Sequence, residues 1–369
     1  MVPQALRPWL LFASLALMWG SSYLFIKIGL ESGLPPLTLI AERLWIAVVA
    51  LVVLFRVTGG RLPREPRTLL RIAVLAPLNI VLPFILITWG ELWIPSAMAS
   101  ILNGLVPLFT IVIAGLVLQD EPITLNRLLG LLVGFGGAAV IVAPDVLGGP
   151  AGGDGAMLLL GELAIVGSSL LYAFAGVYAR AALSSRDLVE EPGGARRAPS
   201  PIEIALIQGA LAALLVTPLA LVLEPAPAGG LILPRLPDGL FAVVWLGLFG
   251  SALAYLLYFR LLRAWGATRT ATLAYVFPVL GTVLGVLVLD ERLDASAIAG
   301  AALVVLGIAL VNTRRLAWQL YGRAPRAAAG HPSGVEVEGA AGCEGCLDEV
   351  EEAAATRPAE RKQSGTVGA

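Results

Sequence analysis

The sequence has little charge for its length, which restricts the class of protein that it can form. Only 14% of its 369 residues are charged, whereas 58% are hydrophobic. A water-soluble chain of this length needs a far larger polar share to cover its surface, so the composition indicates a protein that is solvated by lipid. The formal net charge is -1 and the arginines are scattered among connections, so we expect no nucleic-acid partner.

Cysteine and histidine are also scarce, and both are confined to the polar C-terminal segment. The chain has only Cys343, Cys346 and His331 of these types. This excludes a disulfide framework for the apolar body, and the two thiols have no second pair with which to hold a metal. The apolar body also lacks the H-E-x-x-H, G-x-S-x-G and Walker patterns, so we expect no enzyme activity, metal or cofactor.

Long apolar windows are abundant instead. A window of about 20 apolar residues is long enough to cross a hydrocarbon core, and such windows predict an all-α integral membrane protein with ten transmembrane helices. The predicted spans are 10–30, 36–57, 69–90, 95–118, 124–143, 157–179, 202–223, 239–262, 268–289 and 295–312. The segment 314–369 is rich in Ala, Gly, Arg and Glu with few large apolar residues, which predicts a disordered cytoplasmic tail.

Two stretches of the chain, 100–142 and 271–312, share one pattern. Each contains an apolar helix broken by proline, then an acidic hinge, then a glycine-rich apolar helix. The matching pairs are Pro107 with Pro278, Gly130 with Gly300, and Gly137 with Gly307. An internal duplication of this kind in a hydrophobic chain is typical of transporters, and it predicts two repeats of five helices each, at 1–148 and 155–313.

The distribution of arginine predicts how these repeats cross the membrane. Arginines cluster after the second, sixth and tenth spans and beside the connection from the eighth to the ninth, whereas the opposite connections hold only Arg235 and Arg292. The positive-inside rule therefore puts both termini in the cytoplasm. Because each repeat has an odd number of spans, the second repeat is expected to be inverted relative to the first.

Local motifs within these repeats resemble those of one transporter family. They are WGSSYLFIKIGL at 19–30, Pro36 together with Arg43, Pro107 followed by QDEP at 119–122, and Pro278 followed by LDERL at 289–293. In these motifs the chain resembles the EamA-type family of the drug/metabolite transporter superfamily, over residues 8–313. The resemblance implies ten helices in two inverted five-helix repeats that move small metabolites, often outward, across the inner membrane. The QDEP hinge departs from the glutamate and basic residue that are more common there.

Four ionisable side chains are predicted to lie deep inside the spans: Lys27, Glu42, Arg43 and Glu162. A charge near the bilayer centre costs at least about 2.5 kcal/mol, so it usually faces a polar cavity or a partner. Their similar predicted depth suggests a paired network along the outer half of a substrate pathway. The alternative is that Lys27 snorkels to the membrane surface while the others form a purely structural pair.

Neutral polar and aromatic side chains extend the candidate pathway. Asn103 and Gln208 either hydrogen-bond a neighbouring helix or contact a solute. Pro107 and Pro278 free backbone carbonyls at mid-membrane, which is tolerated only beside protein or a wet cavity, so we expect the solute between these two proline-broken helices. Further positions either line the cavity or pack as core: Trp19, Ser22, Trp89, Tyr172, Tyr255, Tyr258 and Tyr275.

The expected function is secondary transport by alternating access, driven by a pre-existing gradient. The leading version is export of a small amino-acid-like metabolite across a bacterial-type inner membrane. Uptake, or movement of a drug or lipid headgroup, is the alternative within transport, and a non-transporting scaffold or receptor is the alternative outside it. Protons are a candidate coupling ion through Glu42 or Glu162, and a homodimer is a candidate assembly.

Overall fold

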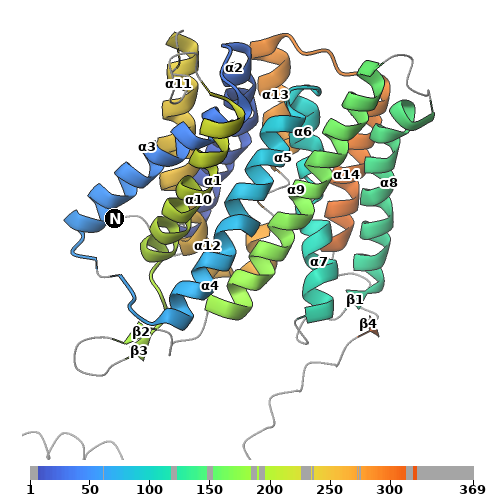
Figure 1. The fold of residues 1–369 in the computed structure, drawn as a ribbon. Coiled ribbons are helices and arrows are strands. Elements are labelled where there is room, and N and C mark those ends of the chain that lie inside the picture. The colour runs from blue at the N-terminus through green and yellow to red at the C-terminus, as the bar shows by residue number, and fades with distance from the viewer. Residues whose placement is uncertain are drawn as a thin grey trace, which may run out of the picture. The chain divides into compact units, whose positions relative to one another are not determined.

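The computed structural model describes residues 7–60, 62–117, 123–147, 153–183, 189–190, 196–225, 234, 237–271, 273, 276–312 and 319–321. These residues form a bundle of long helices (Figure 1). The helices are α1 (Arg7–Gly20), α2 (Ser22–Glu31), α3 (Pro36–Val57), α4 (Pro66–Ala76), η1 (Pro77–Val81), α5 (Leu82–Gly90), α6 (Ser96–Asn103), α7 (Val106–Val117), α8 (Leu125–Leu147), α9 (Gly153–Leu183), α10 (Pro201–Leu223), α11 (Pro237–Trp245), η2 (Leu246–Leu253), α12 (Ala254–Ala271), α13 (Val276–Leu289) and α14 (Ala295–Asn312). Short strands pair antiparallel, β1 (Ile123–Thr124) with β4 (Gln319–Tyr321) and β2 (Val189–Glu190) with β3 (Arg196–Arg197).

Most of the helices are long and apolar enough to cross a membrane. Eight stretches meet this description: Pro8–Glu31, Pro36–Val57, Pro66–Gly90, Ser96–Val117, Leu125–Pro144, Gly155–Leu183, Pro201–Leu223 and Pro237–Trp265. Val276–Leu289 and Ala295–Val311 are apolar but shorter. Large apolar side chains also lie on the outside of the bundle, and helices that are hydrophobic all round are typical of membrane spans. The described chain is therefore a helical multi-pass membrane protein.

Proline determines where many of these helices begin. Pro36, Pro66, Pro201 and Pro237 are the first residues of α3, α4, α10 and α11. A helix tolerates proline in its first turn because the missing N–H would have no partner there. The same preference accounts for the start of the ninth span, which lies later in the sequence than predicted. Its helix α13 begins at Val276 instead of at residue 268, with Pro278 in the first turn. The helix that contains Pro107 is interrupted near this proline as predicted, between α6 and α7.

Two helices contain a π-helical segment. η1 lies between α4 and α5, and η2 lies between α11 and α12. The sequence around Leu82, where η1 gives way to α5, matches the sequence around Leu253, where η2 gives way to α12. π-helical turns are rare and occur frequently at functional sites, because they re-aim side chains and disturb the regular backbone hydrogen bonding.

The helices α8 and α14 pack glycine against glycine. A Cβ added to Gly130 would lie 2.5 Å from the carbonyl oxygen of Gly307, and a Cβ added to Gly137 would lie 2.7 Å from that of Gly300. Only glycine allows two helix backbones to approach so closely. Because Gly130 matches Gly300 in the sequence and Gly137 matches Gly307, exchanging the two stretches turns one contact into the other.

Some predictions fall partly outside the described residues. Of the predicted tail at 314–369, the structure describes only β4, so Cys343 and Cys346 lie outside the described residues. The QDEP hinge at 119–122 also lies outside the described residues.

Candidate functional site

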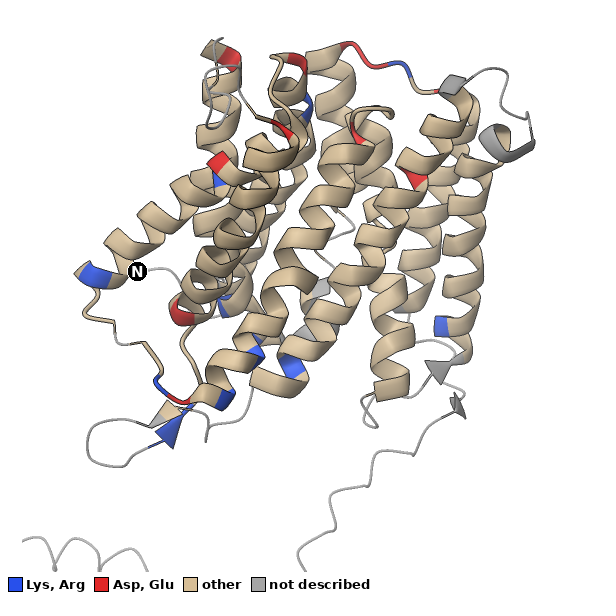
Figure 2. Cartoon of the chain, in the orientation of Figure 1, with Lys and Arg blue, Asp and Glu red and all other residues tan. Residues whose placement is uncertain are grey.

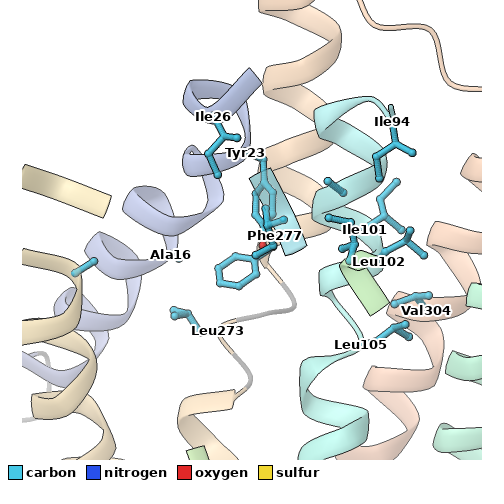
Figure 3. Packing of buried hydrophobic residues seen from close by; sticks show 14 of the residues in the cluster. Ala16, Tyr23, Ile26, Ile94, Ile101, Leu102, Leu105, Leu273, Phe277 and Val304 are labelled. Carbon is cyan, nitrogen blue, oxygen red and sulfur yellow. The ribbon is translucent and has the colours of Figure 1, made fainter. Parts of the chain in front are cut away.

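A cavity of about 100 Å³ lies inside the helix bundle. Its wall is mainly aromatic and aliphatic with a few polar groups, which is the usual composition of a small-molecule site. The lining residues are Trp19, Ser22, Tyr23, Ile26, Arg43, Asn79, Phe84, Ile87, Asn103, Val106, Thr110, Tyr172, Gly176, Tyr258, Thr270, Leu273 and Phe277. Figure 3 shows part of this wall, where Tyr23 of α2 lies beside Phe277 of α13 near Leu273; the two ring centroids are 6.2 Å apart.

Arg43 is the one charged side chain among the described residues that line the cavity. It projects from α3 and is only 2% exposed. Its Nε donates a hydrogen bond of 3.2 Å to the hydroxyl of Ser251 in η2, and its Cζ lies 4.1 Å from the centre of the Phe84 ring. A neutral hydroxyl and an aromatic face thus hold this cation in the interior of the bundle.

Asn103 connects three helices at the break between α6 and α7. Its Nδ2 donates to the hydroxyl of Tyr23 in α2, and its Oδ1 accepts a 2.9 Å hydrogen bond from the hydroxyl of Ser169 in α9. Asn103 is 2% exposed, so these contacts satisfy a buried amide. They also fix the ring of Tyr23 against the cavity.

The two π-helical segments each accept a hydrogen bond from an aromatic side chain. The Tyr255 hydroxyl donates to the carbonyl oxygen of Asn79 in η1 at 2.8 Å, and the indole Nε1 of Trp19 donates to that of Gly250 in η2 at 3.1 Å. The Asn79 side chain in turn donates to Gln208 Oε1 at 3.2 Å. Gln208 and Tyr255 therefore lie behind the cavity wall, where they hold η1 in position.

The cavity brings together some of the side chains that the sequence predicts for a pathway. The predicted residues that line it are Trp19, Ser22, Arg43, Asn103, Tyr172 and Tyr258. The residues that do not line it are Lys27, Glu42, Trp89, Pro107, Glu162, Gln208, Tyr255 and Pro278. Tyr275 lies outside the described residues.

The predicted ionisable network is distributed over separate contacts. Lys27 Nζ donates to the backbone oxygens of Glu91 and Ile94, at 2.8 and 3.3 Å. The carboxylate of Glu42 has no hydrogen-bond partner among the described residues, and Glu162 is fully buried in α9. Lys27 thus binds the connection that follows α5, whereas Arg43 contacts Ser251 in η2.

Sequence reasoning missed several lining residues, although one signal could have revealed two of them. Trp19, Ser22, Tyr23 and Ile26 follow the spacing i, i+3, i+4 and i+7, which puts them on one helical face. All four line the cavity. Residues such as Thr110 and Phe277 carry no comparable signal because their helices are apolar on every side.

Glu91 is another residue that the sequence did not single out. It follows α5 in the connection to α6, outside the helical spans, yet it is 0% exposed. Its carboxylate oxygens have no hydrogen-bond partner among the described residues. Burial raises the pKa of Glu91 well above its ordinary value; Lys27 opposes this shift and Glu291 reinforces it.

Comparisons with known proteins agree with this architecture. The model of the EamA-like transporter family matches residues 7–143 and 159–313. The chain is 30% identical to "Uncharacterized inner membrane transporter YedA" of Escherichia coli (strain K12), over 82% of this chain and 89% of that protein. It is 29% identical to a "Probable terminal-alkyne amino-acid exporter" of Streptantibioticus cattleyicolor, over 81% of this chain and 91% of that protein. A crystal structure that shares 20% sequence identity superposes with a TM-score of 0.60, over 83% of this chain and 96% of that chain, which shows a common fold.

Proposed function

Because the chain belongs to the EamA-like transporter family, we propose that it is a secondary transporter that exports a small amino-acid-like metabolite across a bacterial-type inner membrane. The observation that carries this proposal is the cavity, which has one cation, Arg43, among aromatic and amide side chains. Export of an amino-acid-like compound is supported by the name of the Streptantibioticus cattleyicolor relative. The membrane embedding and the transporter relatives imply a small-molecule solute as the partner.

The proposed architecture is ten transmembrane helices in two inverted repeats, at 1–148 and 155–313. The reciprocal glycine contacts between α8 and α14 support it, because a two-fold relation between equivalent helices produces contacts in such pairs. The matching positions of η1 and η2 support it further. Alternating access would then consist of one repeat rocking against the other around the cavity between them.

The proposed orientation puts both termini in the cytoplasm. Figure 2 shows that basic residues gather at the end of the bundle where α4 begins and β2 and β3 lie, whereas acidic residues predominate at the other end. The positive-inside rule assigns the basic end to the cytoplasm. Lys27, Glu91 and Glu291 then lie toward the outer surface.

The experiment that tests this proposal is mass spectrometry of spent medium from bacterial cells that express the native chain, an Arg43→Gln variant or no transporter. Arg260→Gln serves as the matched control, because Arg260 is exposed and does not line the cavity. We expect a compound to accumulate outside cells with the native or Arg260→Gln chain, and to be lost with Arg43→Gln at equal membrane abundance. Depletion of a compound from the medium would support uptake instead, and three media identical to that of empty cells would contradict transport.

Proton coupling is part of the proposal, through the carboxyl groups of Glu42 or Glu162. The carboxylate oxygens of both acids are buried within the spans, where a carboxyl can take up and release a proton during a transport cycle. In sealed vesicles containing the purified chain, an imposed pH gradient should change the flux of the exported compound. An unchanged flux would leave facilitated diffusion as the mechanism. A homodimer is the proposed assembly, which the mass of the detergent-solubilised chain tests.

A further inference from the structure

We propose that the solute docks its carboxylate on Arg43 and rests an apolar body against the aromatic wall, with no need for a cationic group. This inference rests on the transport function proposed above and names the chemical class of its substrate. It makes the carboxyl group, rather than the complete amino-acid zwitterion, the feature that the cavity recognises.

The free hydrogen-bonding capacity of Arg43 is the first argument. A guanidinium carries five N–H donors in a planar fork that matches a carboxylate. Among the described residues, only the Nε of Arg43 has an acceptor, the hydroxyl of Ser251. The N–H groups of Nη1 and Nη2 therefore remain for a ligand of the cavity that Arg43 lines.

The missing counter-charge is the second argument. A buried cation is costly unless it is paired, and Arg43 has no ion-pair partner among the described residues. Its neighbour Glu42 is about 100° away around α3, because successive residues of a helix point in different directions, and Glu42 does not line the cavity. Phe84 and Ser251 hold the guanidinium in place but neutralise nothing. An anionic solute would supply the negative charge that the described cavity wall lacks.

The rest of the wall is the third argument. No aspartate or glutamate is among the described residues that line the cavity, so an ammonium group of the solute finds no acidic partner there. Trp19, Tyr172 and Phe277 also line the cavity and offer apolar faces. The volume of about 100 Å³ suits a body of only a few carbon atoms. A compact carboxylate with a branched aliphatic body fits these conditions.

Three probes with the same branched body separate the possibilities: isocaproate, leucine and isoamylamine, which at neutral pH are an anion, a zwitterion and a cation. Binding of each to the purified full-length chain is measured by titration calorimetry. We expect isocaproate and leucine to bind at least about tenfold more tightly than isoamylamine, in line with the strength of charged hydrogen bonds. Equal or tighter binding of isoamylamine, or no binding of any of the three, would overturn the inference.

Variants assign the effect to Arg43. Arg43→Gln should weaken isocaproate and leucine about tenfold to 100-fold, whereas Arg43→Lys should retain part of the affinity because it keeps the charge and loses the fork. Arg260→Gln should bind as the native chain does. An unchanged dissociation constant in a folded Arg43→Gln variant would overturn the inference, and the probe comparison on the native chain stands even where that variant fails to fold.

The two proposals can fail separately. If spent medium contains an exported compound that carries no anionic group, the transport function stands and the carboxylate inference falls. If isocaproate binds through Arg43 but the medium never changes, the site is correct and export is wrong.

Discussion

Glu91 is a buried carboxyl group whose protonation should govern part of the stability of this protein. Its pKa is raised above the ordinary value of 4.5, chiefly by burial, so the native chain holds a proton that the unfolded chain has already released. The charged groups that act on it are Lys27 of α2, Glu291 after α13 and Arg43 of α3. The stability that the protonated group provides is fully present below about pH 4.5 and is lost as the pH rises through the native pKa.

Glu91→Gln removes this pH dependence because glutamine stays neutral. We expect thermal unfolding temperatures of the native chain and the variant in detergent to agree near pH 4 and to diverge as the pH rises, with the variant more stable. Glu31→Gln is the control, since Glu31 is exposed and should change nothing. A constant difference in unfolding temperature between the native chain and Glu91→Gln from pH 4 to pH 8 would show that Glu91 does not contribute to the pH dependence of stability.

The residues of the site show what sequence reasoning could reach. Arg43 and Asn103 were predictable because a charge or an amide within an apolar span needs a partner or a cavity. Glu91 was not predictable, because an acidic residue in a connection between spans is expected to be exposed. Its burial becomes evident only from the structure, in which Lys27 packs over the end of α5. Lys27 itself contacts backbone carbonyls, which no pattern of charges in the sequence indicates.

Helix breaks follow from local sequence more directly than π-helical segments do. Proline at the start of α3, α10 and α11 is a signal that the sequence displays. η2 contains no proline, so its presence depends on the contacts that the surrounding helices make with it. One of these contacts is the Trp19 hydrogen bond to the carbonyl of Gly250, and its counterpart at η1 is the Tyr255 hydrogen bond to the carbonyl of Asn79.

Tyr255→Phe should therefore destabilise η1. The substitution keeps the ring and removes the hydroxyl that binds the Asn79 carbonyl, which leaves a buried acceptor without its partner. We expect a loss of about 1 to 3 kcal/mol, measured by chemical unfolding in detergent. Tyr258→Phe is the control, because the Tyr258 hydroxyl has no hydrogen-bond partner among the described residues and its loss should cost less. Equal effects of both substitutions would contradict the role given to the Asn79 contact.

Two neighbouring glycines of α8, Gly136 and Gly137, provide a second pair of matched variants for measuring stability. A Cβ at Gly137 would lie 2.7 Å from the backbone oxygen of Gly300, whereas a Cβ at Gly136 meets nothing within 4 Å. Gly137→Ala should cost about 1 to 3 kcal/mol because backbone must move to admit the methyl group. Gly136→Ala should be neutral or stabilise by up to about 1 kcal/mol, since alanine favours helix. Thermal unfolding of both variants measures the difference, and equal stability would mean that α8 and α14 separate at no cost.

The division of the chain into apolar helices was readable from composition and window length, and eight spans agree with it closely. The ninth was placed too early, because hydropathy alone cannot locate the start of α13 at Val276. Hydropathy also gives no information about which helices pack against each other. The contact of α8 with α14 joins segments more than a hundred residues apart, and only the matching glycines in the two stretches hinted at it.

The inverted arrangement of the halves is testable at two equivalent positions. Arg67 and Asp238 each follow the proline that begins a helix, Pro66 in α4 and Pro237 in α11, and both are exposed. The two helices form the third and eighth spans, so inversion requires their first residues to lie on opposite sides of the membrane. By the positive-inside rule, Arg67 belongs to the cytoplasmic side and Asp238 to the outer side.

Single cysteines measure this directly. With Cys343 and Cys346 replaced by serine, the chain has no other thiol, so Arg67→Cys or Asp238→Cys becomes the one site for a membrane-impermeant maleimide. We expect Asp238→Cys to be labelled on intact cells and Arg67→Cys only after the membrane is permeabilised. Labelling of both from the same side would contradict inverted repeats even if transport activity is found. Labelling of Arg67→Cys alone on intact cells would retain the inversion and reverse the orientation, which would then put Lys27 and Glu91 at the cytoplasmic end of the pathway.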